Sequence, residues 1–308
     1  MEEVKQVQGT EIILRTQNLT KKFGTKVAVN NVNMTIRRGD IYGFIGRNGA
    51  GKTTAMRVIL GMANPTSGSV ELFGGEPFKS ARKKIGSLIE APGLYNGSTA
   101  FENMKRFSIL YGGTDEEIND ILLLVGLSDT GKKKAGQFSL GMKQRLGLGI
   151  ALLGNPEFLV LDEPVNGLDP GGIMDIRNII LKLNKEKGVT VLVSSHLLDE
   201  LAKIVTRYGI INEGNLVEEV NADELNKRCV DGLRIVTNDP ERTQEIVKTE
   251  FGITDYTVKG AAVILHGNGS YIDSAKINAA LVGAGIAVSS LSIQNTGLEE
   301  YFVARLGK

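Results

Sequence analysis

The stretch GRNGAGKTT, residues 46–54, decides the fold class of this chain of 308 residues. It follows the apolar run IYGFIG, residues 41–46, and precedes the helical pattern AMRVILGM, residues 55–62. In the pattern G-x-x-x-x-G-K-[ST], glycines let backbone N–H groups approach phosphate oxygens, and the start of a helix adds partial positive charge. Lys52 can reach the β- and γ-phosphates, and the Thr53 hydroxyl can bind Mg²⁺. The sequence therefore predicts a nucleoside triphosphate site.

Two adjacent carboxylates end a second apolar run, FLVLDEP, residues 158–164. Neighbouring residues of a strand point to opposite sides, so Asp162 and Glu163 can serve different points of one site. One carboxylate can bind the Mg²⁺ ion, and the other can act on a water molecule that attacks the γ-phosphate. Together with the phosphate-binding loop, the pair predicts nucleotide hydrolysis.

Beta-branched runs alternate with helical patterns along the first two thirds of the chain, which is typical of an α/β core. The run FLVL, residues 158–161, is continuously apolar, as expected of a central strand buried on both faces. A short apolar run, Ile85 to Ile89, also has the pattern of a strand. The other predicted strands cover residues 11–17, 41–46, 158–163, 190–195 and 208–214.

Between residues 98 and 127 the pattern becomes helical and predicts a subdomain inserted between strands. Thr99 with Glu102, and Thr114 with Glu117, are spaced as two capping boxes. A stripe at helical spacing predicts core packing or a partner contact: Phe101, Met104, Phe107 and Tyr111. Farther on, Ser139 is suited to cap the helix that follows it.

The chain has two histidines, and they have different surroundings. His196 follows the predicted strand VLVSS, at the carboxyl edge where α/β sheets bind ligands. His266 lies within the apolar run AVILHG and is interpreted as a structural residue.

After about residue 220 the order of predicted elements is β-α-β-β-α-β, which suits a small α+β domain of the ferredoxin-like type. A last helix is expected over residues 297–307. These elements predict a separate C-terminal domain over residues 222–308.

Composition excludes several classes of protein. The formal net charge of +1 gives no strong attraction to nucleic acid or anionic lipid. Cys229 is the single cysteine, so an intrachain disulfide is impossible and a reducing compartment is expected. Residues 1–17 lack the layout of a signal peptide. The most apolar stretch, residues 146–161, is interrupted by polar residues and falls short of the ~20 residues of a membrane span.

Five ordered motifs make residues 11–218 resemble the ATP-binding subunit of ABC transporters: GRNGAGKTT, FSLGMKQR (138–145), FLVLDEP, GLDP (167–170) and SSH (194–196). The resemblance implies a P-loop NTPase core of the α/β class with an antiparallel β subdomain. The helical subdomain corresponds to about residues 91–150. The resemblance also implies a head-to-tail dimer of two copies, with two ATP molecules between them.

The same resemblance implies roles for individual residues. Glu163 becomes the general base, His196 the γ-phosphate switch residue, and Lys52 a catalytic charge. Phe23 stacks on adenine, and Asp169 lies in the loop that couples the two sites. Mg²⁺ is expected on Thr53, Glu90 and Asp162. The expected contacts to ATP are Phe23, Gly46, Asn48, Gly49, Gly51, Lys52, Thr53, Thr54, Glu90, Ser139, Gly141 and Asp169, of which Ser139 and Gly141 act across the dimer interface.

Two departures from the family pattern are informative. In the usual L-S-G-G-Q signature, Phe138, Leu140 and Met142 replace the first Leu, the first Gly and the Gln, whereas Ser139 and Gly141 remain. The position of the usual metal-contacting Gln is occupied by Glu90, a hard oxygen donor that suits Mg²⁺. The context IEAPGLY and the signature FSLGMKQR resemble exporters of lantibiotic immunity and bacitracin resistance.

The resemblance therefore implies an ATPase on the cytoplasmic face of a membrane that powers export of a peptide antibiotic. Its partners are a separate transmembrane permease, which makes most contacts with the substrate, and a second copy of the chain, but no nucleic acid. One alternative is an ABC transporter for another substrate, such as a lipid, a sugar polymer or an ion. A soluble ABC ATPase acting on ribosomes or DNA is disfavoured by the single phosphate loop, and the lack of N-K-x-D disfavours a GTPase.

Overall fold

The computed structural model describes residues 11–196, 198–266, 272–295 and 302. The chain divides into two compact units, Met1–Asn221 and Ala222–Lys308. Among the described residues, none of the helices has the length and apolar character of a membrane span.

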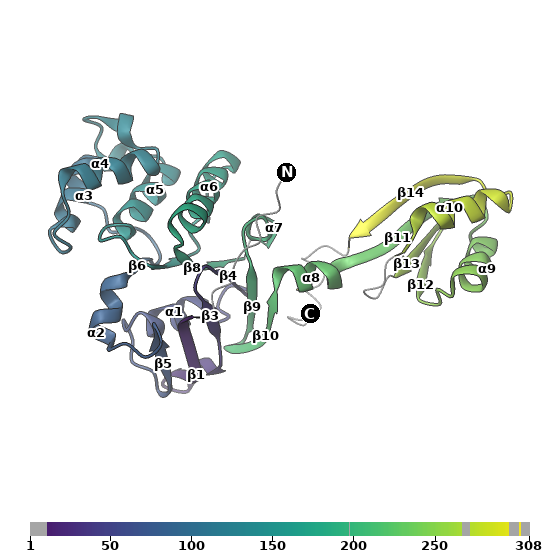
Figure 1. Ribbon diagram of the computed structural model, residues 1–308, viewed down its shortest axis with the longest axis horizontal. Helices are drawn as coiled ribbons and strands as arrows, with labels where there is room; N and C mark the ends of the chain where they lie inside the picture. Colours follow the sequence, from purple (N-terminus) through teal and green to yellow (C-terminus); the bar gives the residue numbers. More distant parts are fainter. Residues whose placement is uncertain (1–10, 197, 267–271, 296–301, 303–308) are drawn as a thin grey trace. The chain divides into compact units, whose positions relative to one another are not determined.

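The first unit is organised around a six-stranded sheet (Figure 1). Its strand order is β10 (Asn215–Asn221), β9 (Arg207–Asn212), β4 (Ile41–Ile45), β8 (Thr190–Ser195), β7 (Phe158–Asp162) and β6 (Ile85–Leu88). All neighbouring strands are parallel except β10, which runs antiparallel to β9. Every residue of β4, β7 and β8 is buried, which confirms the prediction for FLVL. The other strands predicted for this sheet are also present.

The parallel arrangement determines where the candidate functional residues meet. The phosphate-binding loop follows β4, Glu163 follows β7, His196 follows β8, and Glu90 comes two residues after β6. The carboxyl ends of parallel strands lie at one edge of a sheet, so these four segments share that edge.

A second, antiparallel sheet confirms the expected β subdomain near the N-terminus. It contains β1 (Ile12–Phe23), β2 (Lys26–Val32), β3 (Thr35–Arg37) and β5 (Ser67–Leu72), with β1 paired to the other three. Its apolar face and helix α1 (Lys52–Ile59) join residues of the central sheet in one core, which includes Leu14, Val29, Phe44, Met56 and Leu192.

The predicted helical subdomain is present as α3 (Ala100–Ser108), α4 (Asp115–Leu124) and α5 (Leu140–Ala151), which gather at one side of the unit in Figure 1. Thr99 and Glu102 form a complete capping box, as predicted. At α4 the Thr114 side chain accepts from Glu117 N–H, but the Glu117 carboxylate accepts from Gly154 N–H instead of returning to Thr114. Within the stripe, Met104 is fully buried, whereas Tyr111 is about half exposed.

The remaining helices of the first unit are short or flank the central sheet. They are α2 (Phe78–Ala81), α6 (Pro170–Lys187) and α7 (Leu198–Ala202), with 3-10 turns η1 (Arg82–Lys84), η2 (Ser128–Thr130) and η3 (Ala135–Gln137). Helix α6 begins at an Asp169 cap and ends at Gly188, whose φ of +66° is left-handed.

The second unit has the predicted alternation of elements. After α8 (Ala222–Cys229) come β11 (Val230–Thr237), α9 (Pro240–Phe251), β12 (Tyr256–Lys259), β13 (Ala262–His266), α10 (Ser274–Gly283) and β14 (Val288–Asn295). The strands form an antiparallel sheet in the order β12-β13-β11-β14. Its core contains Leu233, Ile235, Val247, Val263 and Leu281. Helix α8 was not predicted, and the helix expected over residues 297–307 lies outside the described residues except for Phe302.

Candidate active site

Two glycines of the phosphate-binding loop are required by close backbone approaches. A Cβ atom at Gly46 would lie 2.4 Å from the carbonyl oxygen of Ile211. A Cβ atom at Gly51 would lie 2.4 Å from the carbonyl oxygen of Ala28, and Gly51 also has a left-handed φ of +109°. The loop is tied to the neighbouring hairpin by a hydrogen bond of 2.9 Å from Gly214 N–H to the Ala50 carbonyl. The loop is therefore held close to the sheet, with the first N–H groups of α1 at its end.

This loop borders a cleft of about 230 Å³. The cleft brings the loop together with the start of β2 and with the carboxylate after β7. Its lining residues are Lys26, Ala28, Asn48, Gly49, Ala50, Gly51, Lys52, Thr53, Thr54 and Glu163. Half of the residues predicted to contact ATP thus face one space, into which a helix N-terminus also opens.

Lys52 places a buried positive charge in the loop. Its Nζ donates to the Gly46 carbonyl at 2.6 Å and to the Arg47 carbonyl at 3.3 Å. The same Nζ lies 3.2 Å from Glu163 Oε1. A buried ammonium group requires such partners, and an arriving phosphate would compete for it with the Glu163 carboxylate.

Thr53 and Asp162 form the part of the site that fits a metal ion. Thr53 Oγ1 donates to Asp162 Oδ2 at 2.7 Å, and Asp162 is buried. Hydroxyl and carboxylate oxygens are ligands that Mg²⁺ prefers. Among the described residues, no group of three or more His, Cys, Asp or Glu side chains could hold a metal by itself. The donor set therefore fits an Mg²⁺ ion that takes its other ligands from phosphate and water.

Glu163 and His196 meet at the ends of neighbouring strands. Glu163 Oε2 lies 2.8 Å from His196 Nδ1. Glu163 Oε1 is buried, and within the described part of the chain it accepts no hydrogen bond despite its ion pair with Lys52. Glu163 also has a left-handed φ of +49°, which is uncommon for a residue with a side chain. A carboxylate oxygen with unused acceptor capacity at the cleft can orient a water molecule.

The structure places Glu90 beside a residue that the sequence analysis did not consider. Glu90 Oε1 lies 2.6 Å from Arg57 Nη2, and both side chains are largely exposed. Arg57 comes four residues after Thr53 on α1, so the two lie on the same face of that helix. Glu90 is thus near the turn of α1 that carries Thr53, but it pairs with Arg57 and not with Asp162 or Thr53. Its role as a metal ligand stays a prediction.

The signature turn and the residue expected to couple the sites lie together, away from the cleft of the same chain. Ser139 caps α5 by accepting from Met142 N–H, as predicted, and Asp169 caps α6 by accepting from Gly172 N–H. A Cβ atom at Gly141 would lie 3.8 Å from Leu168 and 4.0 Å from Gly172. None of the three lines the phosphate cleft. Their predicted contacts to ATP across a dimer interface stay predictions.

Phe23 lies at the end of β1 and pairs with Lys26, which lines the cleft. Its ring is 55% exposed, with Lys21 Nζ 4.9 Å from the ring centre. The ring does not itself line the cleft, and its stacking on adenine stays a prediction.

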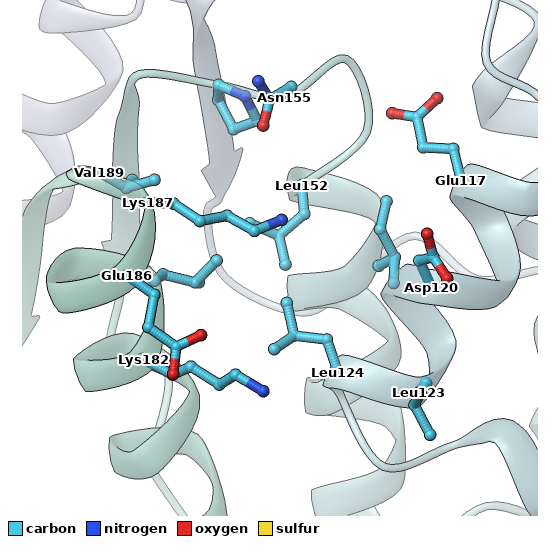
Figure 2. A pocket seen from close by; sticks show the side chains of 13 residues that line it. Glu117, Asp120, Leu123, Leu124, Leu152, Asn155, Lys182, Glu186, Lys187 and Val189 are labelled. Carbon is cyan, nitrogen blue, oxygen red and sulfur yellow. The ribbon is translucent and has the colours of Figure 1, made fainter.

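A larger hollow of about 630 Å³ lies elsewhere, between α4, the end of α5 and α6 (Figure 2). Pro156 and Val189, which come just before β7 and β8, line it, so it lies at the amino edge of the sheet. Leucines form much of its lining, and its charged side chains carry both signs. It lacks the glycine-rich loop that borders the smaller cleft.

Three residues of the site have contacts that were not predicted from the sequence. Ser194 bonds to both Asp162 and Glu163, Arg57 pairs with Glu90, and Lys26 lines the cleft. The serine pair before His196 was a usable signal, because buried hydroxyls at the end of an apolar strand need partners. The partners of Arg57 and Lys26 depend on contacts between distant segments.

The family model described as "ABC transporter" matches residues 29–166. The bacitracin transport ATP-binding protein BcrA of Bacillus licheniformis is 42% identical over 299 residues, which cover 96% of this chain and 97% of that protein. The lantibiotic transport ATP-binding protein SrtF of Streptococcus pyogenes is 44% identical over 211 residues, 68% of this chain and 92% of that protein. A dimeric ATP-binding cassette solved in a post-hydrolysis state with ADP and Pi matches with a TM-score of 0.62 at 26% identity. That match covers 68% of this chain and 99% of the solved one.

Proposed function

The chain belongs to the ATP-binding proteins of ABC transporters, and we propose that it powers the export of a peptide antibiotic of the bacitracin type. The proposed substrate class rests on the similarity to the bacitracin transport ATP-binding protein over 96% of this chain. The match to the lantibiotic transport protein leaves about a third of this chain uncovered, since it spans 68%. The C-terminal unit therefore favours the bacitracin class over the lantibiotic class.

Hydrolysis of ATP is the activity of this family, and the cleft supports specific roles in it. We assign Glu163 as the general base, because its Oε1 has unused acceptor capacity beside Lys52. His196 holds the other carboxylate oxygen at 2.8 Å and orients it. Lys52 supplies positive charge to the β- and γ-phosphates. When bound, Mg²⁺ would neutralise phosphate charge beside Thr53 and Asp162.

Two copies of the chain complete the site in this proposal. ABC ATPases form dimers, and the solved relative with ADP and Pi is dimeric. Ser139 and Gly141 of one copy would contact the γ-phosphate held by the other copy, through the N-terminus of α5. The location of these residues outside the cleft of their own chain supports this arrangement. Asp169, which lies beside the signature turn, would couple the two sites.

The partner that moves the substrate is a separate transmembrane permease. We propose that the ATPase sits on the cytoplasmic face of the membrane and that the permease makes most contacts with the antibiotic. Closure and reopening of the ATPase dimer would transmit the energy of hydrolysis to the permease. We assign the C-terminal unit to the ferredoxin-like type, which its β-α-β-β-α-β order and antiparallel sheet support.

The substrate class is tested by antibiotic resistance in the native host. The gene is replaced by a Lys52→Ala version or by the control Lys187→Ala, which changes an exposed lysine on α6. Growth inhibition is then measured for bacitracin, a lantibiotic and an unrelated fluoroquinolone. The proposal expects sensitivity to bacitracin to rise in the Lys52→Ala strain alone, with no change toward the fluoroquinolone. Unchanged sensitivity to both peptides would favour an ABC transporter for another substrate.

A further inference from the structure

Ser194 links the carboxylate of Asp162 to the backbone N–H of Glu163 through one buried hydroxyl. Its side chain is fully buried, and its Oγ donates to Asp162 Oδ1 at 2.6 Å. The same oxygen accepts from the backbone N–H of Glu163 at 2.9 Å. A serine hydroxyl has one proton to donate and lone pairs to accept, so a single side chain can make both bonds.

The position of Ser194 in the sheet explains these contacts. Ser194 is the register partner of Asp162 in the parallel pair β7 and β8. The hydroxyl therefore reaches the last residue of β7 and the first residue after it. Together with Thr53 Oγ1, which donates to Asp162 Oδ2, it gives each oxygen of the Asp162 carboxylate one hydrogen-bond donor.

The bond to the Glu163 backbone has a second consequence. Glu163 has a φ of +49°, a conformation that surrounding contacts must hold for a residue with a side chain. The bond from its N–H to Ser194 is a partly buried contact at this position. Without it, the backbone of Glu163 can relax and carry the carboxylate away from the cleft. The orientation of Asp162 and the placement of Glu163 thus depend on the same hydroxyl.

We propose that Ser194 is a positioning residue for ATP hydrolysis, which keeps the metal-binding carboxylate of Asp162 and the backbone of Glu163 in a fixed relation. This inference rests on the proposed function of those two residues. Ser194 touches neither ATP nor the attacking water in this proposal. It acts through the residues that do, and outer hydrogen-bond partners of this kind are worth about 10–100-fold in metal affinity or activity.

The test uses the full-length protein with Ser194→Ala, Ser194→Thr and a matched control, Thr190→Val. Thr190 is also fully buried on β8, and its hydroxyl accepts from Gly39 N–H at 3.0 Å at the other end of the strand. The control therefore removes a buried hydroxyl without touching the site. For each variant, kcat and KM for ATP are measured, together with the affinity for a fluorescent ATP analogue with and without Mg²⁺.

For Ser194→Ala we expect kcat to fall about 10–100-fold with KM for ATP within about threefold of wild type. Analogue binding without Mg²⁺ should be unchanged, which also shows that the variant is folded, whereas the gain in affinity on adding Mg²⁺ should shrink. Ser194→Thr keeps the hydroxyl and should recover most of kcat. If its added methyl group prevents folding, the test rests on comparing Ser194→Ala with Thr190→Val in kcat and in the Mg²⁺ dependence of analogue binding.

Two results would overturn the inference. One is a Ser194→Ala protein with wild-type kcat and wild-type Mg²⁺ dependence of binding. The other is a loss that Thr190→Val reproduces in full, because Ser194 would then only stabilise the strand. Glu163→Gln is measured in parallel as a separate reference. If Glu163→Gln hydrolyses ATP at the wild-type rate, the proposed base is wrong, and that failure is distinct from a failure of Ser194.

Discussion

Glu163 Oε2 lies 2.8 Å from His196 Nδ1, although 33 positions separate the two residues in the sequence. The contact exists because β7 and β8 are adjacent and parallel, so the residues that follow them meet at one edge. The residue assigned as general base and the residue assigned to the γ-phosphate thus form one hydrogen-bonded unit. Substitutions at the two positions are expected to be strongly non-additive.

The pairing of Glu90 with Arg57 leads to a prediction about coupling. The pair is largely exposed, and exposed ion pairs contribute only about 0–1 kcal/mol, so Glu90 can exchange Arg57 for Mg²⁺ readily. Glu90→Gln keeps an oxygen ligand and should lower the ATPase rate less than about tenfold, or about 1.4 kcal/mol of barrier. Glu90→Ala should abolish antibiotic resistance even where ATPase activity persists. Full resistance in the Glu90→Ala strain would make Glu90 an ordinary surface acid.

Ser139 should act across the dimer, and mixing experiments test this. Lys52→Ala and Ser139→Ala each damage both sites of their own dimers. In a mixed dimer one composite site carries both changes and the other is intact, so mixing should restore part of the ATPase activity. Mixing Lys52→Ala with Glu163→Gln is the control and should restore nothing, because both residues lie in the same half-site. Failure to recover activity while co-purification shows mixed dimers would argue against independent composite sites.

Tyr42 gives a prediction about stability at alkaline pH. Its side chain is fully buried and donates to Glu219 Oε1 at 2.9 Å. Burial, and then the charge of Glu219, raise the pKa of Tyr42 well above its usual value. The phenol ionises in the unfolded chain near pH 10 but stays neutral when folded. Its contribution to stability is therefore complete below about pH 10 and is lost as pH rises further.

Urea denaturation of wild type and Tyr42→Phe measures this dependence. At pH 8 the variant should be less stable by about 1 kcal/mol, because Glu219 loses one donor but keeps the Thr35 N–H. Above about pH 10 the difference in free energy of unfolding between the two proteins should narrow by up to about 1.4 kcal/mol per pH unit. Tyr95→Phe, at a half-exposed tyrosine, is the control and should show no such narrowing. A constant difference in free energy of unfolding between wild type and Tyr42→Phe from pH 8 to 11 would contradict the raised pKa of Tyr42.

Much of the fold was predictable because the signals are local. The loop at residues 46–54, the buried runs that became β4, β7 and β8, and the Thr99 capping box all depend on residues close together in the sequence. The second predicted capping box was half wrong, since Glu117 bonds to Gly154, 37 residues away. Spacing cannot show such competition between a local partner and a distant one.

Several residues of the candidate site could be predicted from motifs, but the hydrogen bonds and ion pairs between them could not. The motifs predicted Lys52, Asp162, Glu163 and His196, because each begins, ends or follows a recognisable element. The bonds of Ser194 depend on the register of two strands, and the partner of Glu90 depends on the placement of α1. These contacts join segments more than 30 residues apart, and no single stretch of sequence contains them.

The most direct test of the central claim is the behaviour of Glu163→Gln beside Glu186→Gln, which changes an exposed carboxylate on α6. ATPase rate and gel filtration with ATP and Mg²⁺ are measured for both proteins. We predict that Glu163→Gln loses about 10²–10⁴-fold in rate and elutes as an ATP-bound dimer, whereas Glu186→Gln matches wild type. Wild-type hydrolysis by Glu163→Gln, or its elution as a monomer with ATP bound, would contradict the account.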